Sequence, residues 1–341
     1  MESASIASGD RLRLQRSPLA RLPDRALKYG LTALAASILA LIVYFFIKLV
    51  GEAGPAFAKF GVFGFTFGNN WNVSANQFGA LPLLVGTLIT SGLALIIGVP
   101  VAVATALYVT ELCPLRVRGP VTILIELLAA VPSVVYGLWG IFFLAPKLQP
   151  AEQWVADRLS FVPFIGGGLV TIPNYFITGL ILAIMILPIV SSISREVMST
   201  VPADHKEAAF GLGATRWEMI RIAVLPYCRS GISGAAMLGL GRAIGETIAV
   251  TILVGDAPVL GGHLFGQGYS LAAAIANEFG EAQELHRSAL FAAGLVLFVL
   301  TLLVNVIARL LVLRASRANK PKRAVRDSGE TDMLAETALG A

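Results

Sequence analysis

Long apolar runs separated by short polar segments set the pattern of this chain. A helix of about 19 residues is about 28 Å long, which matches the hydrocarbon thickness of a bilayer. Six runs are long enough to cross it, at 29–47 and at about 83–109, 121–145, 171–193, 231–255 and 288–313. We therefore predict an all-α integral membrane protein with six transmembrane helices.

The first run raises one alternative, a cleavable signal peptide. Ala56-Phe57-Ala58 has the small residues of a cleavage site. The run at 29–47 is nevertheless longer than the apolar core of a signal peptide, which is about 7–15 residues. An uncleaved membrane anchor is therefore expected.

The composition excludes soluble classes of protein. Hydrophobic residues make up 56% of the 341 residues and charged residues only 14%, with a mean hydropathy of +0.77. No soluble surface is built from so few charges. The 26 Lys and Arg exceed the 21 acidic residues, but most of them flank the apolar runs. This excess orients the chain in the membrane and does not indicate nucleic-acid binding.

The distribution of basic residues predicts that orientation. Nineteen of the 26 Lys and Arg lie in segments that share one side of the membrane if six helices cross it in turn. These segments include both tails, and the basic side is the cytoplasmic one. The predicted organisation is a cytoplasmic basic tail at 1–28, a first helix and extracytoplasmic loop at 29–79, a core with the other five helices at 80–313, and a polar cytoplasmic tail at 314–341 that is disordered from Lys320 on.

The sequence offers little chemistry of its own. It has no GxxxxGK stretch, so no ATP-binding P-loop is expected. Cys113 and Cys228 lie far apart and are interpreted as free thiols, and the histidines (His205, His263 and His286) lack metal-ligand spacing. We expect neither an enzyme, nor a bound cofactor, nor a metal site. The energy for any transport must come from a partner or an ion gradient.

One segment, residues 202–226, is too charged and glycine-rich to cross a bilayer; we call it the docking segment. Asp204 as N-cap, with Glu207 three residues on, predicts a short helix that ends at the glycines Gly211 and Gly213. Thr215-Arg216-Trp217-Glu218 fits a capping box and predicts a second helix, which Pro226 ends. The apolar face of this second helix contains Trp217, Ile220 and Val224. Such helices either rest on lipid headgroups or fit a groove of a cytoplasmic protein.

A motif in this segment favours the second interpretation. Glu207-Ala208-Ala209, Gly213 and Leu225-Pro226 resemble the EAA motif of the membrane subunits of ABC importers. The resemblance implies that 202–226 forms coupling helices, which sit in a cleft of the ATPase subunit and transmit its closure. Ala223 departs from the motif, because the family usually has Ile there, and this weakens one packing position.

Ionisable residues inside an apolar span cost about 3 kcal/mol or more, so they are candidates for function. Arg242 lies near the centre of the 231–255 run, and Glu246 is expected one turn later on the same helix face. The two form either a structural ion pair or an anion path, because a guanidinium offers bidentate donors to an oxyanion. Glu126 is interpreted as structural, either paired with a partner subunit or reaching the membrane interface.

Three further stretches resemble one branch of these permeases, the phosphate-transporting PstC family: Ile125–Gly140, Leu238–Thr247 and Ala276–Phe279. The resemblance covers about residues 30–313. It implies half of a type I importer in the bacterial inner membrane, which moves phosphate past Arg242 and Glu246 by alternating access. It also implies a PstA-like second permease, two PstB-like ATPase subunits that use ATP and Mg, and an extracytoplasmic PstS-like phosphate-binding protein.

Two alternatives stay open at this point. A single Arg suits any tetrahedral oxyanion, so a sulfate or molybdate permease fits the residues equally well. A stand-alone secondary transporter would explain the membrane spans, but it would not need coupling helices.

Overall fold

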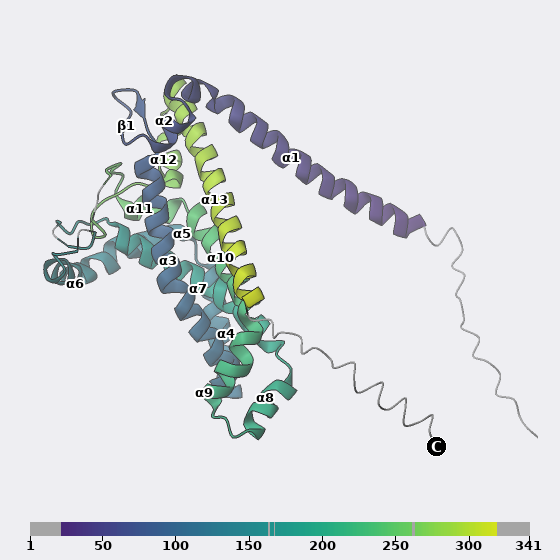
Figure 1. Ribbon diagram of the computed structural model, residues 1–341. Helices are drawn as coiled ribbons and strands as arrows, with labels where there is room; N and C mark the ends of the chain where they lie inside the picture. The colour runs from purple at the N-terminus through teal and green to yellow at the C-terminus, as the bar shows by residue number, and fades with distance from the viewer. Residues whose placement is uncertain (1–21, 163, 167, 261–262, 319–341) are drawn as a thin grey trace, which may run out of the picture. The chain divides into compact units, whose positions relative to one another are not determined.

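The computed structural model describes residues 22–318 except 163, 167 and 261–262 (Figure 1). Most of the basic tail and the chain from 319 on, including the expected disorder after Lys320, lie outside the described residues. The chain divides into two compact units, one up to Glu52 and one from Ala53 on. In its described part, the first unit is the N-terminal portion of a single helix, α1 (Leu22–Phe60), of which Ala26–Phe60 is long and apolar enough to cross a membrane.

Three unbroken helices of the second unit also pass that test. They are α3 (Leu81–Leu107), which continues into the π-helical turn η2 (Tyr108–Leu112), α7 (Tyr175–Ser199) and α13 (Glu284–Ala318). Together with α1 they cover the apolar runs at 29–47, 83–109, 171–193 and 288–313. The prediction of membrane-length helices at these four places is therefore confirmed.

The other two runs form bent pairs of helices. The prediction of one unbroken helix over each of these runs is therefore wrong. The first run contains α4 (Leu115–Ala130), then α5 (Ser133–Trp139), η3 (Gly140–Leu144) and α6 (Ala145–Arg158), with a bend of 92° after α4. Pro132 explains the break, because a proline forces the preceding residue out of the helical region; Val131 has φ −68° and ψ 126°.

The second bent pair consists of α10 (Leu225–Gly245) and α11 (Ile248–Val254), with an angle of 64° between them. Glu246 has extended backbone angles, φ −70° and ψ 128°, and therefore lies outside both helices. With four unbroken helices, the described residues hold up to six membrane crossings if each bent pair makes one.

Close packing of α3 against α7 forms the centre of the second unit. A Cβ added at Gly179 would lie 2.5 Å from the Cβ of Leu93, and one added at Gly98 would lie 2.9 Å from the side chain of Ile186. Small residues at these positions let the two backbones approach, which is how membrane helices gain van der Waals contact. Helix α10 packs against both α7 and α3 and completes this core.

The two ends of the second unit differ in structure (Figure 1). One end carries α2 (Val62–Phe67), α12 (Leu271–Glu278) and an antiparallel hairpin of β1 (Trp71–Asn72) and β2 (Gln77–Phe78). The hairpin was not predicted; its buried Trp71 and Phe78 face each other across the strands with ring centroids 5.1 Å apart. The opposite end carries the docking segment.

Candidate functional site

The docking segment folds into two short helices, as predicted, but its first helix begins differently. Helix α8 (Ala203–Gly211) has Pro202 as its N-cap, and no side chain caps it. Asp204 lies inside the first turn, where its carboxylate still interacts favourably with the helix dipole. Gly213 has φ +82°, in the left-handed region that glycine adopts without strain, and it ends the turn before the second helix.

The second helix, α9 (Arg216–Met219), begins with the predicted capping box. Thr215 Oγ1 accepts a hydrogen bond from the backbone N–H of Glu218 at 3.3 Å, and Glu218 Oε2 accepts one from the Thr215 N–H at 2.8 Å. The prediction that this helix ends at Pro226 is wrong. The helix continues through the π-helical turn η4 (Ile220–Val224) into α10, and Pro226 lies in the first turn of α10, where its missing N–H is tolerated.

The docking segment has a small apolar core of its own. Ala209, Met219, Ile220 and Val224 are buried there. Trp217, which was expected on the same face as Ile220, is 64% exposed instead. This core includes residues of α3 and α7, which hold the two short helices firmly against the bundle: Ala106 and Met198.

What remains exposed is a surface suited to a partner. Glu207 and Ala208 of the EAA-like motif are exposed on α8, whereas Ala209 is buried. Three large apolar side chains also face outward, at 45%, 88% and 64% exposure: Phe210, Leu212 and Trp217. Leu225 and Ala223 are half-buried and Pro226 is exposed. A cluster of outward apolar side chains on a rigid support is typical of a docking surface.

One ion pair ties this surface to a membrane helix. Lys206 Nζ of α8 lies 2.7 Å from Glu111 Oε1 of η2, and both side chains are largely buried, at 23% and 8% exposure. The pair joins residues that are far apart in sequence and were not connected by the sequence analysis. It fixes the position of α8 relative to the end of α3.

The mid-span candidates do not form the expected ion pair. Arg242 lies in the last turn of α10 with an exposed side chain, and Glu246 lies just beyond the helix end. Among the described residues, no hydrogen bond or ion pair joins them, because the break at Glu246 takes its side chain off the face of α10. A basic residue in a last helical turn interacts favourably with the free carbonyls there, so Arg242 also has a structural role.

The two helix breaks lie close to each other in space. Helix α5, which follows one break, packs against α11, which follows the other. A Cβ at Gly137 of α5 would lie 3.3 Å from the Cα of Ala249 of α11. Tyr136 donates a hydrogen bond to the carbonyl of Leu128 at 2.8 Å across the first break. Two stretches of the PstC-like pattern, around 125–140 and 238–247, therefore meet at these breaks.

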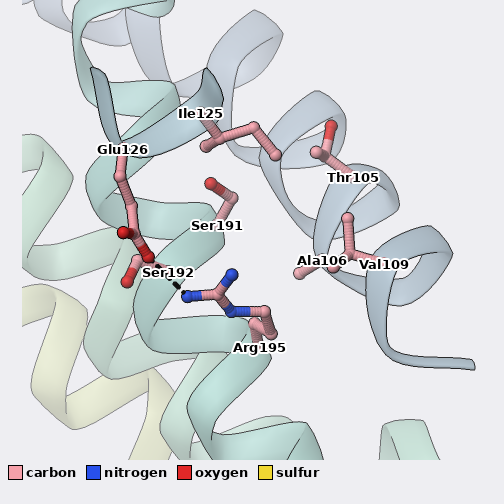
Figure 2. Close-up of a pocket in the computed structure, with 8 residues that line it drawn as sticks. All are labelled: Thr105, Ala106, Val109, Ile125, Glu126, Ser191, Ser192 and Arg195. Atoms are coloured by element: carbon pink, nitrogen blue, oxygen red, sulfur yellow. Dashed lines mark hydrogen bonds and ion pairs between the residues drawn. The ribbon is translucent and has the colours of Figure 1, made fainter. Parts of the chain in front are cut away.

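A second polar site lies between α4 and α7, nearer the docking segment (Figure 2). Arg195 Nη2 lies 2.9 Å from Glu126 Oε1, and Arg195 Nη1 donates to Thr122 Oγ1 at 2.6 Å. Glu126 thus pairs with a basic residue of its own chain. The gap that Figure 2 shows beside this pair is only about 10 Å³, which is about enough for one water and too small for an oxyanion.

At the opposite end, Glu278 is a hydrogen-bonding hub. Its carboxylate accepts from Trp71 Nε1 of the hairpin at 3.1 and 3.2 Å, and its Oε2 lies 2.7 Å from His286 Nε2 of α13. The neighbouring Asn277 donates to Asp256 at 2.8 Å. The Ala276–Phe279 stretch therefore holds this end of the bundle together, through contacts that sequence spacing could not reveal.

Cys113 and Cys228 are both free thiols, as predicted.

Comparison with known proteins connects this geometry to a family. The family model for the inner membrane component of binding-protein-dependent transport systems matches residues 98–317. A phosphate transport system permease protein PstC from Pasteurella multocida is 46% identical over 275 residues, which is 79% of this chain and 85% of that protein. The PstC of Mesorhizobium japonicum is 44% identical over 291 residues, 83% of this chain and 88% of that protein.

Among solved structures, a bacterial ABC transporter involved in the import of the acidic polysaccharide alginate has a similar chain. Its TM-score is 0.56 at 21% identity, and the match covers 86% of this chain and 99% of that chain. At this level of identity the similarity concerns the fold alone.

Proposed function

The chain belongs to the family of inner membrane components of binding-protein-dependent transport systems, and we propose that it is the permease subunit of an ATP-driven importer of inorganic phosphate. The observation that carries the proposal is the docking segment, with its buried core, its ion pair to η2 and its exposed Glu207 and Ala208. The names of the relatives supply the substrate.

The proposed topology has six membrane crossings and both termini in the cytoplasm of a bacterial inner membrane. Counting each bent pair as one crossing gives six, which returns the chain to the side where it began. The docking segment then lies on the same side as the termini, where an ATPase would meet it. The excess of Lys and Arg in the segments on that side supports this orientation.

The chain itself hydrolyses nothing in this proposal. It pairs with a PstA-like permease, two PstB-like ATPase subunits bind ATP and Mg, and a PstS-like protein delivers phosphate from outside. Closure of the ATPases pushes the docking segment, and the two permeases rock around a site near the middle of the membrane. That site includes Arg242, whose guanidinium offers bidentate donors to an oxyanion, and Glu246, which limits how tightly the anion is held.

The test is uptake of radiolabelled phosphate in cells that lack their own high-affinity system and express this chain with its partners. We expect Arg242→Gln to abolish uptake while the complex still assembles, and Arg242→Lys to retain part of it, because the charge remains but the planar fork is lost. Undiminished uptake by Arg242→Gln would remove the arginine from the pathway. Inhibition of wild-type uptake by sulfate or molybdate would leave the assignment as an ABC importer unchanged, but it would contradict the assignment of phosphate as the substrate.

The docking role has a separate test. Glu207→Arg reverses an exposed charge on α8, so we expect ATP hydrolysis to lose its coupling to transport while the permease still inserts. Unchanged ATPase binding and transport would refute this role.

The third possibility, a stand-alone secondary transporter, requires no ATPase. It would be favoured if the purified chain moved phosphate by itself in liposomes.

A further inference from the structure

A polar pocket opens beside the Arg195–Glu126 pair, where α4 begins and α7 ends next to the docking segment. Its volume is about 350 Å³, roughly ten times the 30 Å³ that one water occupies in the liquid. It is therefore far larger than the single-water gap described above. Its lining combines two guanidinium groups, three hydroxyl groups and one carboxylate: Arg118, Arg195, Thr122, Ser192, Ser199 and Glu196.

Arg195 is held in place by two contacts that leave some of its N–H donors free. A guanidinium has five N–H donors in a fixed plane. Glu126 and Thr122 each engage one nitrogen of Arg195, at 2.9 and 2.6 Å. Three N–H donors remain, and the two anchors fix the plane in which they point, so binding a ligand would cost little side-chain entropy.

Arg118 supplies a second guanidinium at the same pocket. It lies on α4 four residues before Thr122, and therefore on the same face of that helix. Its side chain is half-buried, and within the described residues no hydrogen bond or ion pair engages it. Two guanidinium groups that line one pocket together with hydroxyl groups are a ligand set for a phosphate group.

Glu196 narrows the choice of ligand. An ionised carboxylate can only accept hydrogen bonds, so it repels an anion that has no proton to donate. Phosphate near neutral pH still carries a P–OH group, whereas sulfate and the phosphodiester of a lipid headgroup do not. The carboxylate therefore favours free phosphate over both of these groups.

We propose that this pocket is an exit site, which binds inorganic phosphate on the docking side of the membrane after it has left the middle of the bundle. This inference rests on the proposed function. Ser199 at the pocket is the last residue of α7, and α8 begins four residues later at Ala203. Any movement of the docking segment therefore acts directly on the pocket wall.

The test is equilibrium binding of radiolabelled phosphate to the complete transporter in phosphatidylcholine nanodiscs, without the binding protein. We expect saturable binding that Arg118→Gln weakens about 10-fold or more, since a charge-assisted contact of that strength is lost. Arg116→Gln is the matched control, because this exposed arginine lies two residues away on α4 and does not line the pocket. Sulfate should not compete.

Three results would overturn the exit site: no saturable binding, equal binding by Arg118→Gln and wild type, or equal loss in Arg116→Gln. A fourth is retention of phosphatidylglycerol, detected by native mass spectrometry and lost in Arg118→Gln, with no binding of free phosphate; the pocket would then hold a lipid headgroup. Phosphate import by wild-type transporter with its binding protein is measured in parallel. Import without Arg118-dependent binding refutes the exit site alone, and absence of import refutes the proposed function.

Discussion

The ion pair between Lys206 and Glu111 offers a quantitative test of how the docking segment is held. The two charged atoms are 2.7 Å apart, and at an effective dielectric constant of about 20 their attraction is about 6 kcal/mol. Desolvation of both groups offsets much of this. Glu111 is only 8% exposed, so removing Lys206 leaves a carboxylate buried without its partner, which costs about 3–5 kcal/mol at fully buried sites. Because Lys206 is 23% exposed, we expect about 2–3 kcal/mol for Lys206→Met.

Hydrogen exchange of the α8 amides measures this quantity in the assembled protein. A loss of about 2 kcal/mol in local stability should speed exchange about 30-fold in α8, and leave the middle of α7 unchanged. Glu111→Gln and the double variant complete a mutant cycle, in which the two changes should be strongly non-additive. A coupling energy below about 0.5 kcal/mol would show that the pair does not hold the docking segment.

Three further predictions concern other parts of the molecule. Gly86→Ala places a methyl group against a backbone carbonyl of the neighbouring loop and should lower stability by about 1–3 kcal/mol in thermal unfolding, whereas Gly92→Ala, with open space beside it on the same helix, should be tolerated. Thr215→Ala removes the cap of α9 and should cost about 1 kcal/mol, seen as faster exchange confined to α9; exchange as slow as in wild type would contradict the capping role. Burial, assisted by repulsion from Glu278, raises the pKa of Asp256, so stability should fall as the pH rises above about 4, and Asp256→Asn should raise the melting temperature at pH 7 but not below pH 4; a gain at both pH values would contradict this reasoning.

The sequence predicted those features that depend on neighbouring residues. The membrane-length helices follow from the length of their apolar runs, and the capping box at Thr215 needs only residues within one turn. The EAA-like residues also fell on a surface that the structure leaves exposed, at Glu207 and Ala208. In each case the relevant physics acts within a few residues along the chain.

Features that depend on distant residues could not be predicted. Arg195 and Glu126 are 69 positions apart, and Trp71 and Glu278 are 207 apart, so no spacing rule links them. Arg195 did carry a signal, because a basic residue near the end of one span and an acidic residue near the same end of another can pair.

Helix breaks were the other source of error. Pro132 lies inside an apolar run, but proline is often tolerated in membrane helices, so the pattern could not distinguish a kink from a break. At Glu246 the only comparable signal is the preceding Gly245, and because other glycines lie inside the same helix, that residue did not mark the break. The break removed the expected pairing with Arg242, which had assumed one regular helix.

The continuity of α9, η4 and α10 has a mechanical consequence. These elements form one uninterrupted helix from Arg216 to Gly245, about 45 Å long at 1.5 Å per residue. A helix resists compression along its axis, so this one can transmit an axial displacement that begins at the docking segment. Its other end lies next to Glu246, where a 64° bend separates it from α11. Because of this bend, an axial displacement of the long helix would move α11 sideways.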